Sequence, residues 1–394
     1  MAAVLVGADG ELAEPRDVPP TAQALLASLA SAASSGGGDG ANAAPSAPPP
    51  PNYTTALAVW SGDGGYEVVD WHLHVERLER DARDGSLPAV ATRRAARALA
   101  ALAAAASPPP RAAMLVVAAV AGQSQPSVLA YAKAAPPYAA ALEPPLTPPA
   151  ALRVVAALGS GGRREAGAKR CAWVSQRAPL EAWAAASGRY DEVLLVDGDD
   201  DAVLEGLVSN FYAIVEKEEE EEEKGGGKGG GGGGGGGRGG DPTPDLASLV
   251  LETAVDPNAL PGVVQRRVLE AAARLGLAVR APAAAGGGGP SLAALRAGRW
   301  REALASSCLR GLAPVAGVCV RRYRPGRRGG DGGGGDGGAG ATSWDATLPP
   351  AGPVGRLLMD EVRALQRCAR LLVSAKEEEE EERAGGGGGG GGGG

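Results

Sequence analysis

The sequence contains few residues that could bind a metal ion. It has four cysteines and two histidines in 394 residues, and no two cysteines are spaced as C-x-x-C. Zinc sites usually draw on cysteines and histidines at short, regular spacing. We therefore predict no metal site. The scattered thiols favour a reducing intracellular compartment over a secreted, disulfide-stapled protein.

Long apolar runs are also missing. No uninterrupted apolar stretch reaches the roughly 18 residues that a membrane-spanning helix needs, so no membrane partner is expected. The N-terminal segment carries Asp9, Glu11, Glu14 and Asp17, although organelle transit peptides are poor in acidic residues and signal peptides begin with basic ones. A cytoplasmic location is expected, with a plastid as the alternative.

The charge distribution does not indicate a nucleic-acid partner. The formal net charge is −7, but the glutamate runs at 218–223 and 377–382 supply much of the negative charge. The rest of the chain is mildly basic, without the clustered lysines and arginines of a nucleic-acid-binding surface. The acidity of the whole chain therefore says nothing about its partners.

Glycine and proline, at 63 and 31 residues, divide the chain into parts. Such stretches cannot bury an apolar core, so we predict unstructured inserts or linkers where they are dense. The predicted organisation is a small N-terminal α/β domain at 1–134 with an insert at 35–51, a proline-rich linker at 135–150, and a larger domain at 151–323 with an insert at 216–240. After it come a glycine-rich loop at 324–342, a helical region at 343–376 and an unstructured tail at 377–394.

Hydrophobic spacing predicts both helices and strands. Short apolar segments bounded by turn residues predict strands at 53–60, 66–70, 114–121, 152–158 and 191–196. Helical spacing predicts helices at 21–34, 89–106, 173–186, 262–275 and 354–375. Strands that alternate with helices and hairpins, in two blocks joined by a linker, predict an α+β protein of two domains.

A polar cassette interrupts the apolar segments between residues 191 and 215. Glu205 and Gly206 stand between two predicted strands, and Asn210 follows shortly after. Burying a carboxylate there is costly without a partner, so Glu205 needs a specific explanation. Lysine gives a second clue: of six lysines, only Lys133 and Lys169 lie away from the glutamate and glycine runs.

This stretch resembles the class IV pyridoxal-phosphate enzymes, which include branched-chain and D-amino-acid aminotransferases and aminodeoxychorismate lyase. Those proteins carry a lysine before a helix and then E-G-x-x-x-N-x-[FY] or a close variant, which Lys169, Glu205, Gly206, Asn210 and the pair Phe211 and Tyr212 match. Residues 251–263 resemble the phosphate-binding segment, 306–315 the second phosphate-side turn, and 72–78 the family's H-x-x-R-L. The match runs in order over most of 53–320 and looks closest to a plant-type, D-amino-acid-aminotransferase-like branch.

The resemblance implies a class IV aminotransferase-like fold, with pyridoxal 5'-phosphate in the cleft between the two domains, a small amino-acid substrate and a homodimer. It also implies that Lys169 forms the Schiff base with the cofactor and that Glu205 holds the proton on the ring nitrogen. Arg77 would bind the phosphate. The other cofactor-binding residues implied are Asn210, Gly262, Val263, Val264, Ser306 and Ser307.

Each assignment has a simpler alternative. Lys169 is otherwise a solvated loop lysine, Glu205 an acid paired with an arginine, and Arg77 a surface arginine. The chain also differs from the family's usual residues at Val174, Val264, Gln265 and Leu207. Three functions stay open: an enzyme acting on an amino acid or aminodeoxychorismate by transamination or lyase chemistry, a non-catalytic relative, and an interaction protein that works through its glutamate and glycine tracts.

Overall fold

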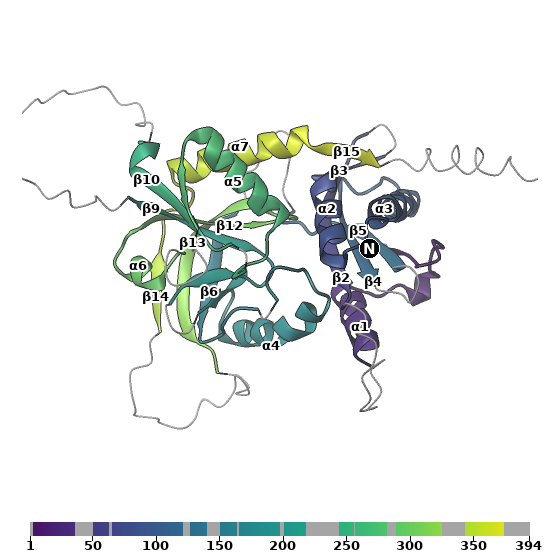
Figure 1. Ribbon diagram of the computed structural model, residues 1–394, viewed down its shortest axis with the longest axis horizontal. Helices are drawn as coiled ribbons and strands as arrows, with labels where there is room; N and C mark the ends of the chain where they lie inside the picture. Colours follow the sequence, from purple (N-terminus) through teal and green to yellow (C-terminus); the bar gives the residue numbers. More distant parts are fainter. Residues whose placement is uncertain are drawn as a thin grey trace, which may run out of the picture.

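The computed structural model describes residues 3–35, 50–62, 65–120, 127–139, 150–163, 165–197, 201–217, 244–255, 257–281, 289–324 and 343–373. The described residues form two bodies, each built on one sheet, which lie side by side (Figure 1). This confirms the α+β, two-domain fold predicted from the sequence. Most of each predicted insert, and the whole predicted tail, lie outside the described residues.

The smaller domain contains a six-stranded sheet in the order β1-β5-β4-β2-β3-β15. Its strands are β1 (Ala3–Val6), β2 (Asn52–Trp60), β3 (Tyr66–Val69), β4 (Ala112–Val120), β5 (Ser127–Ala134) and β15 (Arg370–Val373). Helices α2 (Trp71–Ala82) and α3 (Leu87–Ala104) bury leucines such as Leu78 and Leu99 with the core strand residues. Helix α1 (Ala22–Ser35) packs Leu25 and Leu26 against Tyr53 of β2 and Val116 of β4. The hydroxyl of Thr21 caps α1 by accepting from the Ala24 amide at 3.1 Å.

The larger domain contains a nine-stranded sheet, with eight strands in the order β11-β10-β9-β12-β13-β6-β7-β8 and β14 paired to β13. Its strands are β6 (Leu152–Leu158), β7 (Glu192–Val196), β8 (Val203–Gly206), β9 (Asn210–Glu216), β10 (Leu249–Thr253), β11 (Ala278–Arg280), β12 (Trp300–Ser307), β13 (Gly311–Arg322) and β14 (Trp344–Thr347). Helices α4 (Ala172–Ser187), α5 (Val263–Leu275), α6 (Leu292–Arg296) and α7 (Pro353–Cys368) pack on it. Helices α5 and α7 share one core cluster with β9 and β12, while α4 packs on β6 and β7 through Trp173 and Leu180.

The C-terminal helix ends earlier than the sequence predicts. A helix over 354–375 was expected, but α7 ends at Cys368 and the chain continues as β15, which pairs antiparallel with β3 of the other domain. The apolar run 371–373 fits a helix or a strand equally well by periodicity. The open edge of β3 decides the outcome, because its backbone groups gain partners when β15 pairs with it.

The predicted insert at 35–51 also extends too far at its C-terminal end. Pro51 is buried, and its carbonyl accepts a hydrogen bond from the Cys171 amide at 2.8 Å. The Tyr53 amide donates to the Lys169 carbonyl at 2.9 Å, and Asn52 forms a bridge with Arg170. These contacts join the start of β2 to the loop that precedes α4, so the two domains meet at Lys169. None of the helices among the described residues has the length and apolarity needed to span a membrane.

Candidate active site

A cavity of about 450 Å³ lies between the two domains. The smaller domain contributes residues from α1, α2, β2, β4 and β5, and the larger domain contributes residues from α4, β8 and β12 and from the start of α5. All nine residues singled out in the sequence line it: Arg77, Lys169, Glu205, Asn210, Gly262, Val263, Val264, Ser306 and Ser307. The structure therefore brings together residues from five separate segments of the chain.

Lys169 lies in the loop before α4, where the backbone holds it in place. Its amide donates to a carboxylate oxygen of Asp81 at 3.2 Å, and its carbonyl accepts from the Tyr53 amide. The amine lies 4.8 Å from the centre of the Tyr53 ring. Burial, followed by the nearby charge of Arg77, lowers the pKa of Lys169 to about 7. Lys169 is thus not a solvated loop lysine, and a large fraction of its amine is unprotonated at neutral pH.

Arg77 projects from α2 and is buried, with 5% of its surface exposed. One guanidinium nitrogen donates to the Thr54 hydroxyl at 2.8 Å, and that hydroxyl also contacts Nδ1 of His74 at 2.7 Å. The Nε of Arg77 has no hydrogen-bond partner among the described residues. No carboxylate among those residues forms an ion pair with the Arg77 guanidinium, and the nearby Asp81 pairs with Arg80 instead. Burial lowers the pKa of Arg77. A buried cation without a counterion, facing a cavity, is suited to binding an anion there.

Glu205, on β8, has an arginine partner that the sequence analysis did not identify. Arg163 donates to the two carboxylate oxygens at 2.7 and 3.3 Å, and the Leu260 amide donates to one of them at 3.0 Å. Both side chains of the ion pair are about 5% exposed or less, and the Arg163 guanidinium lies 5.0 Å from the Trp173 ring centre. Burial raises the pKa of Glu205, although the Arg163 charge acts in the opposite direction. The carboxylate therefore has the partner that its burial requires, and it also lines the cavity.

Gly262 lies directly before α5, where there is no space for a side chain. A Cβ at this position would lie 2.1 Å from Oδ1 of Asn210. The Asn210 side chain is held in turn by donating to the Leu260 carbonyl at 2.7 Å. The first amides of a helix have no partner within the helix, so the start of α5 at Val263 and Val264 can supply donors to an anion in the cavity.

Ser306 and Ser307 end β12 at the same cavity. The Ser306 hydroxyl is buried and lies 2.8 Å from the Tyr212 hydroxyl, whereas Ser307 accepts from the Arg310 amide at 3.3 Å. Ser307 is less buried than Ser306, so its hydroxyl is the more accessible of the two. The sequence alone left the choice between them open.

The cavity lining also includes charged residues that the sequence analysis missed. Arg177 of α4 forms an ion pair with Glu181 at 2.9 Å. Arg310 lies 4.7 Å from the Tyr138 ring centre and donates to the Asp191 carbonyl at 3.3 Å. No motif in the sequence marks these arginines, because their role depends on contacts between segments that are distant in the chain. Within the described ranges, no group of three or more histidine, cysteine, aspartate or glutamate side chains could hold a metal ion.

One protein family matches the chain. The family described as amino-transferase class IV matches residues 53–318, which is about two-thirds of the sequence and includes all nine of the sequence-predicted residues that line the cavity. None of the curated proteins compared with the chain matches it.

Several solved structures share the fold at low sequence identity. A hypothetical aminotransferase from Mycobacterium tuberculosis in its apo form is 17% identical with a TM-score of 0.54, covering 93% of this chain and 99% of that one. Its PLP-bound form is 18% identical with a TM-score of 0.50 and the same coverage. A branched-chain aminotransferase from Thermoproteus uzoniensis with norvaline is 16% identical with a TM-score of 0.53, covering 94% of this chain and 98% of that one.

Proposed function

The chain belongs to the class IV aminotransferases, a family that uses pyridoxal phosphate, and from this premise we propose that it is an aminotransferase acting on an amino acid. One observation carries the proposal: a single cavity between two domains is lined by a lysine with a lowered pKa, a buried carboxylate and a buried arginine without a counterion. These are the groups that a pyridoxal-phosphate enzyme needs for attachment, for the ring nitrogen and for the phosphate.

The residues of the cavity fit this cofactor in three respects. Arg77 lacks an anionic partner among the described residues, and a phosphate would provide one. Gly262 and the first residues of α5 line the cavity, so the helix amides that have no partner within the helix are available to an anion there. The cavity volume of about 450 Å³ lies within the range of small-molecule sites.

When bound, the cofactor would act as an electron sink for the substrate's α-carbon. Lys169 would hold the cofactor through its Nζ amine and, when that amine is free, would carry a proton to and from the substrate. Glu205, which pairs with Arg163, would keep a proton on the ring nitrogen. Arg77 and the amides at the start of α5 would bind the phosphate, with Ser307 as a further donor.

Lyase chemistry on aminodeoxychorismate and loss of turnover are the alternative proposals. The second rests on particular side chains. Val264 offers no hydroxyl to the cavity, and Gln265 is turned away to donate to the Ala254 carbonyl at 2.8 Å. Both differences lie on the phosphate side of the site, so they bear on cofactor binding more than on proton transfer.

Absorbance spectroscopy and peptide mapping test the proposal. Purified protein incubated with pyridoxal phosphate should gain a near-visible absorbance band, and borohydride reduction should fix the label on the peptide containing Lys169. Lys133 also lines the cavity, so Lys133→Met is the matched control and should be labelled normally. Labelling at Lys133 in the parent protein, or no labelling of any lysine, would refute the assignment.

Single-turnover reactions then separate the three activities. The loaded protein is mixed with a panel of L- and D-amino acids and with aminodeoxychorismate, and the absorbance change and products are recorded. A response to amino acids supports transamination, and pyruvate release from aminodeoxychorismate supports the lyase. A protein that binds the cofactor but responds to neither is the non-catalytic relative.

We also propose that the protein is a homodimer. Light scattering on the purified protein tests this directly, and a monomeric mass would contradict it. A cytoplasmic location, with a plastid as the alternative, is proposed on the sequence features alone and is tested by imaging the fluorescently tagged protein.

A further inference from the structure

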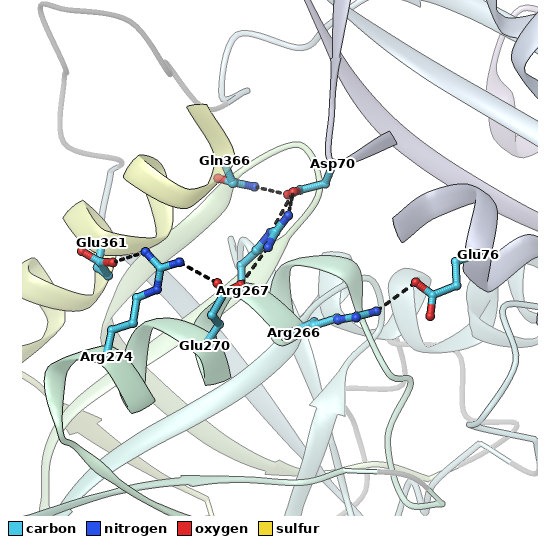
Figure 2. A network of polar contacts seen from close by, with 8 residues as sticks. All are labelled: Asp70, Glu76, Arg266, Arg267, Glu270, Arg274, Glu361 and Gln366. Carbon is cyan, nitrogen blue, oxygen red and sulfur yellow. Dashed lines mark hydrogen bonds and ion pairs between the residues drawn. The ribbon is translucent and has the colours of Figure 1, made fainter. Parts of the chain in front are cut away.

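Ion pairs across the domain boundary join α2 of the smaller domain to α5 of the larger one (Figure 2). Asp70, directly before α2, accepts a hydrogen bond from Nε of Arg267 on α5 at 2.8 Å, and Nη2 of Arg267 forms an ion pair with the same carboxylate oxygen at 2.7 Å. The Asp70 side chain is 1% exposed and that of Arg267 is 12% exposed. Glu270 holds the other side of the same guanidinium at 2.7 Å.

A third helix contributes to the same contact. Nε2 of Gln366, on α7, lies 3.5 Å from the second carboxylate oxygen of Asp70, and the Asp70 amide donates to the Ala369 carbonyl at 2.9 Å. Gln366 is buried. Asp70 has φ of 53°, a left-handed backbone conformation that non-glycine residues rarely adopt. Both the side chain and the backbone of Asp70 are thus fixed by the larger domain, in a conformation that needs such support.

The Asp70–Arg267 contact lies close, along both helices, to the groups that would bind the cofactor phosphate. Asp70 is the N-cap of α2, and Arg77 follows it by seven residues on that helix, so the contact fixes the end of the helix that carries Arg77 about two turns further on. Arg267 follows Gly262 by five residues, which is about one and a half turns behind the end of α5 that opens to the cavity. The Asp70–Arg267 contact therefore links the helix that carries the phosphate-binding arginine to the helix whose amides would bind the same phosphate.

We propose that Asp70 and Arg267 are positioning residues that set the separation of Arg77 from the start of α5, and so determine the affinity for the cofactor phosphate. The inference rests on the proposed function, because it assumes that these two groups bind one phosphate. Neither Asp70 nor Arg267 lines the cavity, so they act through the groups they position.

The chain provides a matched control on the adjacent residue. Arg266 of α5 pairs with Glu76 of α2 at 3.0 Å, across the same boundary (Figure 2). Those side chains are 61% and 63% exposed, and exposed pairs contribute little because water and salt screen them. If any bond between the two helices were sufficient, replacing either arginine would change the affinity for the cofactor phosphate equally. If the buried contact positions Arg77, only replacing Arg267 changes that affinity.

The test compares affinities for pyridoxal phosphate and for pyridoxal, which lacks the phosphate. Both ligands are titrated by absorbance into the parent protein, Arg267→Gln, Asp70→Asn, Arg267→Lys and the control Arg266→Gln. We expect Arg267→Gln and Asp70→Asn to reduce the preference for the phosphorylated ligand about tenfold, the lower end of what a displaced charge-assisted contact contributes. Arg267→Lys, which keeps the charge, should recover part of the preference, and Arg266→Gln should match the parent.

A double variant and the pattern of ligand preference decide the inference. In an Arg77→Ala background, Arg267→Gln should reduce the preference less than twofold further, because the group it positions is absent. Equal loss of affinity for both ligands, or a full additional tenfold loss without Arg77, would show a general structural role and overturn the inference. If the parent protein prefers the phosphorylated ligand and Arg267→Gln keeps that preference, the positioning role alone is overturned. A parent without any such preference would overturn the proposed phosphate site as well.

Discussion

The lowered pKa of Lys169 makes cofactor attachment depend on pH in a way that an ordinary lysine cannot reproduce. With a pKa of about 7 instead of 10.5, about half of the Lys169 amine is unprotonated at pH 7, against about one molecule in three thousand for an unperturbed lysine. Only the unprotonated amine condenses with an aldehyde. The rate of attachment should therefore rise with pH up to about 7 and then level off.

Stopped-flow mixing of cofactor-free protein with pyridoxal, from pH 5.5 to 9.5, measures this directly. Pyridoxal avoids any change in phosphate binding, and a free amine such as N-acetyl-lysine methyl ester corrects for titration of pyridoxal itself. Arg77→Gln should move the inflection to higher pH, because Arg77 is the largest charge that lowers the pKa of Lys169. Lys133→Met should leave the inflection unchanged.

A rate of attachment that continues to rise about tenfold per pH unit through pH 9 would refute the low pKa of Lys169.

The lowered pKa of Lys169 also has a consequence for the stability of the fold. Between pH 7 and 10.5 the unfolded chain keeps a proton on this lysine that the folded chain has lost, so the contribution of Lys169 to stability should increase with pH across that window. Chemical denaturation of the parent and of Lys169→Met at several pH values would measure the difference.

Three further perturbations test the surroundings of the site. Gly262→Ala places a methyl group 2.1 Å from an amide oxygen, so we expect a loss of about 1–3 kcal/mol in unfolding free energy by denaturant titration. Relative to the parent, the variant should also lose more affinity for pyridoxal phosphate than for pyridoxal. Arg163→Gln leaves the buried Glu205 carboxylate without its ion pair and should cost about 3–5 kcal/mol, whereas replacing both residues by glutamine should cost less. Thiol reagents should label the exposed Cys368 first, and pyridoxal phosphate should protect Cys308, which lines the cavity, without affecting Cys368.

Periodicity in the sequence was sufficient to predict several elements to within a residue or two. The helix expected over 173–186 is observed as α4 at Ala172–Ser187, and the one expected over 262–275 is α5 at Val263–Leu275. Both helices bury one side on a sheet, so their apolar residues repeat at helical spacing. The candidate site residues could be identified because their types and order match a family pattern, and the structure then places them all in one cavity.

Contacts between distant segments could not be predicted in this way. Strand β13 is twelve residues long, but proline and glycine occur within it, so the sequence indicated only a turn at its start. The arginine that pairs with Glu205 lies 42 residues earlier and is no different in sequence from other surface arginines. Asp70 is similarly unremarkable in the sequence, and only the folded chain shows that Arg267, 197 residues later, contacts it.

The position of the site at the domain boundary explains why each domain alone would be incomplete. The smaller domain supplies Arg77, but it also fixes the loop that holds Lys169, because the Tyr53 amide of β2 donates to the Lys169 carbonyl and the Asp81 carboxylate of α2 accepts from the Lys169 amide. The larger domain supplies Lys169, and after its last helix, α7, the chain continues as β15, which pairs with β3 in the sheet of the smaller domain. Each domain therefore orients a functional group that belongs to the other. A phosphate bound by Arg77 and by α5 would contact both domains at once, so its binding should resist their separation. Loading the cofactor should therefore protect the amides of β15 and of residues 52–54, which join the two domains, from hydrogen exchange. The amides of β14, at the far edge, should gain less protection.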